Sequence, residues 1–124
     1  KVCAVSESRL DATTTVQELI DAVASFRDAR DWAQFHAPKN LSMSIAIEAA
    51  ELMEHFQWIS AEESHLRLKD PAGRAAIAAE LADVLLYCFS LASIAGYDVT
   101  TIVRSKLAAN ARKYPADRYK GRYS

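Results

Sequence analysis

Apolar residues recur every three or four positions along most of the chain, a spacing that places them on one face of an α-helix. Strict alternation of apolar and polar residues, which is typical of a half-buried strand, does not occur in the sequence. The predicted helices cover residues 16–35, 41–58, 60–68, 71–95 and 99–113. We therefore expect an all-α protein whose four longer helices form an antiparallel four-helix bundle.

Residues that cap or break helices stand at the ends of these segments. Thr15 and Glu18 fit a capping box, in which each side chain bonds the other residue's backbone N–H, and so do Ser60 and Glu63. Proline and glycine mark the breaks between helices. The remaining positions expected to cap, start or end helices are Pro38, Asn40, Asp70, Pro71, Gly96 and Asp98.

The chain of 124 residues is long enough for a single core. We expect an extension at 1–14, one helical domain at 15–115 and a basic tail at 116–124. The net charge of −1 predicts neither nucleic acid nor an anionic membrane as a partner. The apolar stretch 84–97 is too short to span a bilayer. Cys3 and Cys88 are expected to be free thiols, and no signal-peptide pattern opens the sequence, so a cytoplasmic location is expected.

Two pairs of carboxylates occupy positions that the pattern assigns to the interior. Glu48 and Glu51, three residues apart, both lie on the apolar side of the helix at 41–58. Glu80 and Asp83 repeat this spacing and are the only charged residues between positions 75 and 97. Buried carboxylates are unfavourable without a positive partner, so these four predict a cation between the two helices. The apolar stripe around the first pair consists of Leu41, Ile45, Leu52 and Phe56.

The positive partner is either a basic side chain or a metal ion. Segments 41–58 and 71–97 contain one basic residue, Arg74, whereas Lys106 and Lys113 share a face of the last helix with Asn110 and could neutralise part of the charge. A hard divalent cation fits better, because carboxylate oxygens are the ligands that Mg²⁺ and Mn²⁺ prefer. Zinc and di-iron sites are disfavoured because no His or Cys joins the cluster.

The two acidic motifs, EAAE at 48–51 and ELAD at 80–83, resemble the ExxE…ExxD signature of the all-α MazG-like nucleoside triphosphate pyrophosphohydrolases. The surrounding segments are most similar to the dCTP pyrophosphatase branch of that family. These segments are FRDARDWAQFHAPKNL (26–41), ELMEHFQW (51–58), ELADVLLYCFSLA (80–92) and SKLAANARKYP (105–115).

The resemblance implies a reaction in which water attacks the α-phosphorus of a dCTP-like nucleotide, releasing pyrophosphate and the monophosphate. It implies Mg²⁺ as cofactor and assigns metal binding and catalysis to Glu48, Glu51, Glu80 and Asp83. Mn²⁺ is the expected substitute, because it prefers the same oxygen ligands. The substrate-binding residues that it implies are Trp32, His36, Trp58, Tyr87, Lys106 and Asn110. Val23 is apolar where some cytosine-preferring relatives have a polar residue, which leaves the base preference open.

Other functions remain open from the sequence. The same reaction on dUTP or on a broad range of nucleotides is one, and a helical oligomerisation or adaptor module with a structural acid cluster is another. The segment 41–58 is apolar around most of its circumference, with Met43, Ala46 and Met53 outside the main stripe. A helix that is apolar on nearly all sides is buried on nearly all sides, so a homodimer or a dimer of dimers is expected.

Overall fold

The computed structural model describes residues 9–122, and every regular element in that range is a helix. The all-α prediction is confirmed. Cys3, like the rest of segment 1–8, lies outside the described residues, while Cys88 is a free, half-buried thiol as predicted. The elements are η1 (Leu10–Ala12), α1 (Val16–Ala29), η2 (Trp32–Phe35), α2 (Pro38–Glu54), α3 (Ala61–Arg67), α4 (Pro71–Ala95), α5 (Val99–Lys113) and α6 (Ala116–Tyr119), where η denotes a 3₁₀ helix.

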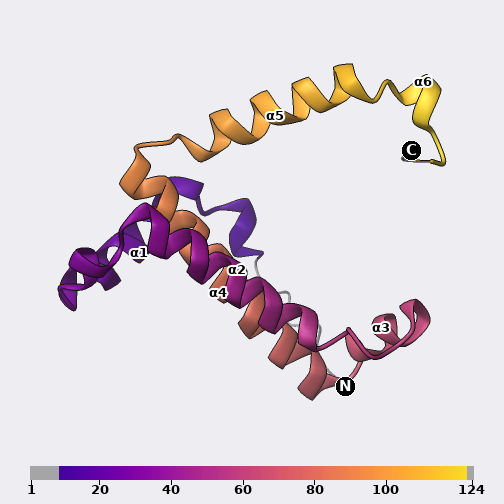
Figure 1. Ribbon diagram of the computed structural model, residues 1–124, viewed down its shortest axis with the longest axis horizontal. Coiled ribbons are helices and arrows are strands. Elements are labelled where there is room, and N and C mark those ends of the chain that lie inside the picture. Colours follow the sequence, from indigo (N-terminus) through magenta and orange to yellow (C-terminus); the bar gives the residue numbers. More distant parts are fainter. Residues whose placement is uncertain (1–8, 123–124) are drawn as a thin grey trace.

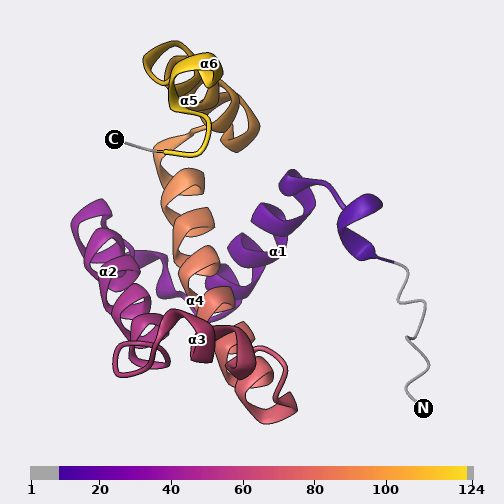
Figure 2. The ribbon, with the colours of Figure 1, turned by 90° about the vertical axis from the view of Figure 1, so that its right-hand side faces the viewer.

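Helix α4 is the centre of the molecule. It packs along α2 and, over a shorter length, against α1, so that it lies between these two helices (Figure 2). The buried apolar residues come from these three helices: Ile20, Leu41, Ile77 and Ala92. Other apolar side chains of α4, such as Leu81 and Leu85, remain exposed. A single chain therefore covers only part of the apolar surface of its central helix.

The predicted capping boxes are present. The Thr15 side chain accepts a hydrogen bond from the backbone N–H of Glu18 at 3.0 Å, and the Glu18 carboxylate accepts one from the backbone of Thr15 at 3.2 Å. Ser60 and Glu63 make the same exchange at the start of α3. Helices α4 and α5 are each capped by an aspartate: Asp70 and Asp98. Gly96 ends α4 with φ of 73°, a conformation in which a Cβ would be strained.

The first predicted helix is interrupted. The prediction of one helix from 16 to about 35 is wrong, because α1 ends at Ala29 and Asp31 adopts a left-handed conformation with φ of 54°. Aspartate tolerates this region better than most residues, and the reversal separates α1 from η2. The break changes the direction of the chain just before Trp32.

The second helix is displaced toward the N-terminus relative to its prediction. It begins with Pro38 at its first position, where proline is favoured, rather than after an Asn40 cap. The Asn40 side chain instead donates to the carbonyl of Phe35 at 3.3 Å. The helix ends at Glu54, so Trp58 lies in the following turn and is 87% exposed.

Helix α5 lies away from the pair formed by α2 and α4 (Figure 1), and its contacts with the other helices are sparse. Three of the four main helices thus pack together within one chain, and the fourth does not close the bundle. Its apolar residues Ile102, Val103 and Leu107 are exposed. The segment predicted as a tail adds the short helix α6, where Tyr119 packs edge-on against Tyr114 with ring centroids 5.2 Å apart.

Among the described helices, α4 alone is long and apolar enough to cross a bilayer. Length and composition are weak evidence, because a central core helix has the same properties. Helix α4 also carries Glu80 and Asp83, and it packs against helices on two sides. A core helix accounts for these features better than a membrane span does.

Candidate active site

Helices α2 and α4 bring three carboxylates together. Glu48 projects from α2, and Glu80 and Asp83 project from α4, one turn apart. One carboxylate oxygen from each lies within 4.8 Å of those of the other two, and all three residues are half-buried. The expectation that both acidic motifs face the same space between the helices is confirmed for these three residues.

Glu51 lies beside this group and contributes to its electrostatics. Burial raises the pKa of Glu48 to about 7, and the neighbouring Glu51 carboxyl adds to that shift, followed by Asp83 and Glu80. The pKa of Glu80 is also raised, first by burial, then by Glu51 and Asp83, while His55 acts in the opposite direction. The neighbouring acids Glu51 and Asp83 therefore lie close enough to destabilise the charged forms of Glu48 and Glu80.

The donor set suits a hard divalent cation. The Oε2 atoms of Glu48 and Glu80 are buried and have no hydrogen-bond partner. The sole side-chain ion pair within residues 9–122, Arg27 with Asp28, lies outside the acidic cluster. The predicted alternative of a structural cluster neutralised by lysine is not seen within one chain. Oxygen atoms at this mutual separation, without a basic partner, can hold a metal ion.

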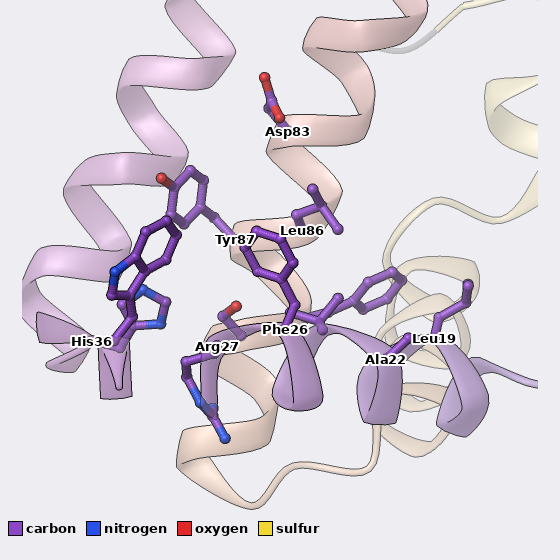
Figure 3. Close-up of a pocket in the computed structure, with 12 residues that line it drawn as sticks. Leu19, Ala22, Phe26, Arg27, His36, Asp83, Leu86 and Tyr87 are labelled. Carbon is purple, nitrogen blue, oxygen red and sulfur yellow. The ribbon is translucent and has the colours of Figure 1, made fainter. Parts of the chain in front are cut away.

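A pocket of about 470 Å³ opens beside Asp83, between α1, η2 and α4 (Figure 3). Asp83 belongs both to the acidic cluster and to the pocket wall, so the two form a continuous site. Trp32, His36 and Tyr87, three of the predicted substrate-binding residues, also line the pocket. The remaining lining residues are Leu19, Ala22, Val23, Phe26, Arg27, Leu86, Phe89 and Ser90.

The reversal at Asp31 explains how Trp32 and His36 reach this pocket, because a continuous helix would have carried them in a different direction. Trp32 packs edge-on against Phe26, with ring centroids 5.7 Å apart. The Nδ1 atom of His36 is buried and has no hydrogen-bond partner. An aromatic lining with an available polar atom is suited to a heterocyclic base.

Sequence reasoning did not single out Phe26, Arg27, Leu86 or Phe89 as pocket residues. The apolar members have the pattern of ordinary core residues. For Arg27 the sequence did offer a signal. It lies one turn after Val23 and two turns after Ile20, on the face of α1 that turns inward.

Three predicted substrate-binding residues are not at this site within one chain. Trp58 is exposed in the turn after α2. Lys106 and Asn110 lie on α5, which stands apart from α2 and α4, the two helices that carry the acidic cluster (Figure 1). Their predicted contact with phosphate therefore requires another arrangement of α5 or a second chain.

A profile of the MazG-like family matches residues 43–123, which include both acidic motifs. The chain belongs to the MazG-like family. The resemblance inferred from the acidic motifs is thereby confirmed. The chain also resembles a solved structure, a pyrophosphatase from Archaeoglobus fulgidus, with 42% identity, a TM-score of 0.75, and coverage of 80% of this chain and 91% of that one.

The curated relatives are named dCTP pyrophosphatase 1. The protein from Mus musculus is 37% identical over 113 residues, which cover 91% of this chain and 66% of the relative. The protein from Homo sapiens is 40% identical over 102 residues, which cover 82% of this chain and 60% of the relative. The chain thus spans about three fifths to two thirds of the length of these relatives.

Proposed function

We propose that this protein is a metal-dependent nucleotide pyrophosphohydrolase that cleaves dCTP-like nucleoside triphosphates to the monophosphate and pyrophosphate. The observation that carries this proposal is the continuity between the carboxylate cluster and the aromatic pocket, which meet at Asp83. The names of the relatives support the substrate class. A triphosphate spans such a site with its base in the pocket and its phosphates at the acids.

The acidic residues hold Mg²⁺, with Mn²⁺ as a substitute. When bound, the ion neutralises phosphate charge and lowers the pKa of a coordinated water. Glu48, Glu80 and Asp83 supply the ligand oxygens, and their helices fix the spacing of those oxygens. Glu51 lies beside them and is suited to orient the attacking water or to accept its proton.

The pocket residues position the substrate. Trp32 offers an aromatic face to the base, and His36 offers its buried Nδ1 atom. Tyr87 lies one turn after Asp83 on α4, between the acids and the base pocket, where its hydroxyl can reach the sugar or a phosphate.

The functional form that we propose is a dimer or a dimer of dimers in which α5 packs against a second copy. Helix α5 exposes the apolar residues Ile102, Val103 and Leu107, and α4 leaves Leu81 and Leu85 uncovered. Lys106 and Asn110 lie on the same face of α5 as these apolar residues. Docking of that face on a partner would carry the cation toward the partner's acids and supply the positive charge that each acidic cluster lacks.

The direct test is pyrophosphate release from a panel of nucleotides, with Mg²⁺, with Mn²⁺ and with excess chelator. We expect dCTP and related deoxynucleotides to be cleaved in a metal-dependent manner. Hydrolysis that persists in excess chelator would refute the metal-dependent mechanism. A well-folded protein that binds no metal and cleaves no nucleotide would instead favour an adaptor role.

A further inference from the structure

Arg27 is the one lysine or arginine on the wall of the pocket, as far as the described residues show. Its side chain is 13% exposed, whereas the side chain of the adjacent Asp28 is 62% exposed. The Nε atom of Arg27 donates to the Asp28 carboxylate at 3.0 Å. This contact ties one edge of the guanidinium to the protein and restricts its rotation.

The other edge of the guanidinium has no protein partner. Within residues 9–122, the bond from Nε is the sole hydrogen bond that the Arg27 side chain donates, so neither Nη atom is paired. A guanidinium presents its N–H donors in a fixed plane and has no acceptor. Neither Nη is among the buried polar atoms that lack a partner in the described part of the chain, so both reach solvent and are free to donate to a ligand that occupies the pocket.

The position of Arg27 separates it from the phosphate end of the site. In Figure 3, Arg27 and Asp83 lie on opposite sides of the aromatic rings of Phe26 and Tyr87. The acids at the Asp83 end attract the metal and its phosphates, so a base in the pocket points its polar edge toward α1. The pocket is therefore negative at one end, aromatic in the middle and positive at the other.

We propose that Arg27 is a specificity-determining residue that donates from its two Nη groups to the neighbouring acceptors O2 and N3 of a cytosine ring. This inference rests on the proposed nucleotide pyrophosphohydrolase function. Paired acceptors on the edge of one base match the fork of an arginine, as they do when arginine binds guanine in nucleic acids. Uracil and thymine carry a hydrogen on N3, so one Nη donor of Arg27 would face the N3–H donor of the base. The O2 atom would then be the one acceptor left for the guanidinium.

The experiment combines a side-chain change with the removal of one base atom. Pyrophosphate release would be measured for the wild type, Arg27→Gln and Arg27→Lys with dCTP, dUTP and 3-deaza-dCTP, in which a C–H group replaces N3. Arg27→Lys keeps the charge but loses the planar fork. Arg67→Gln is the control, since it removes an arginine that is exposed in the last turn of α3 and does not line the pocket. Melting curves would confirm that each variant is folded.

For the wild type we expect kcat/KM for dCTP to exceed that for dUTP and for 3-deaza-dCTP. Both Arg27 variants should lower the ratio of kcat/KM for dCTP to kcat/KM for dUTP on the order of 10- to 100-fold. They should cleave dCTP and 3-deaza-dCTP with nearly equal kcat/KM. Arg67→Gln should keep the wild-type ratios. If Arg27→Gln weakens all three substrates equally, the side chain binds phosphate or supports the fold, and the inference is overturned. If the wild type cleaves none of them, the proposed function itself fails.

Discussion

Glu48 of α2 and Asp83 of α4 bring carboxylate oxygens to within 4.8 Å of each other, although both residues carry like charges when ionised. The contact between α2 and α4 holds them there, and Leu41 and Ile77 are buried in the core to which these helices contribute. Hydrophobic packing thus fixes two acids at a distance that their own repulsion opposes. Such an arrangement is useful if a cation binds between them.

Replacing either of these acids with its amide should raise the stability of the metal-free protein and lower its activity. In the absence of metal, Glu48→Gln and Asp83→Asn should raise the melting midpoint, because each removes a destabilising negative charge. Turnover should fall about a hundred-fold or more, since an amide is a weaker ligand for a hard cation. Thermal melting and pyrophosphate release on the same samples check both effects.

Glu54→Gln provides the matched control, because Glu54 is exposed at the end of α2 and does not belong to the cluster. It should change neither the activity nor the melting midpoint appreciably. Equal loss of activity in all three variants would indicate a general charge effect rather than ligation by Glu48 and Asp83.

The pKa of Glu48 predicts an unusual pH dependence of stability. Because this pKa is raised from 4.5 to about 7, the folded protein retains a proton that the unfolded chain has already lost in that range. The free energy of unfolding of the metal-free protein should therefore fall as pH rises from 4.5 to about 7. Melting curves in chelator check this, and Glu48→Gln should flatten the decline.

Mg²⁺ should reverse that trend. Metal binding requires deprotonated carboxylates, so the increase in melting midpoint on adding Mg²⁺ should be larger near pH 8 than near pH 5. An increase of the same size at both values would show that the ion stabilises the protein elsewhere. Titrating Mg²⁺ into Asp83→Asn locates the effect, because that variant should respond weakly.

The two tryptophans should report different events. Trp32 lines the pocket, whereas Trp58 is exposed in the turn after α2. Binding of dCMP, a product of the proposed reaction, should change the fluorescence of a Trp58→Phe variant, in which Trp32 is the one remaining tryptophan. In a Trp32→Phe variant, a change at Trp58 is expected only if assembly brings Trp58 of one chain to the pocket of another. Dilution below the dissociation constant of the assembly should then abolish that second signal.

Helix ends were predictable where the determining hydrogen bonds are local. The capping pairs Thr15–Glu18 and Ser60–Glu63 form as the sequence predicts, because each involves residues only three apart. The convergence of the acidic motifs was predictable for a related reason. Helical periodicity assigns Glu48 and Asp83 to apolar faces, and apolar faces pack together.

Features that depend on backbone reversals or on contacts between distant elements were not predictable from the pattern. A left-handed residue at Asp31 leaves no periodic trace, yet it decides where Trp32 and His36 lie. The sequence places Arg27 on the inward face of α1, but the pocket that it lines is formed by α1, η2 and α4 together and leaves no mark in the pattern. The position of α5 could not be predicted from the sequence either. An apolar stripe on a helix can pack against its own chain or against a second copy, and the pattern does not distinguish the two.

A change on the apolar face of α5 should disrupt the assembly that we propose. Val103→Asp places a charge among exposed apolar residues, whereas Ala108→Asp places the same charge on the opposite side of the helix. Sedimentation should show a shift to monomer for Val103→Asp alone, with loss of activity. A wild-type protein that sediments as a monomer at the concentrations of the assay would contradict the proposed assembly.

Mixing two inactive variants should reveal whether α5 serves the acids of its own chain or those of a partner. Glu48→Gln damages the acidic cluster, and Lys106→Ala removes the cation from α5. If Lys106 acts on a partner, one site of each mixed dimer joins an intact cluster from one chain to an intact Lys106 from the other, so unfolding and refolding the two variants together should restore activity. If Lys106 acts within its own chain, every site in the mixture keeps a defect and activity stays low. Each variant refolded alone provides the baseline, and restored activity would assign the cation to the partner chain.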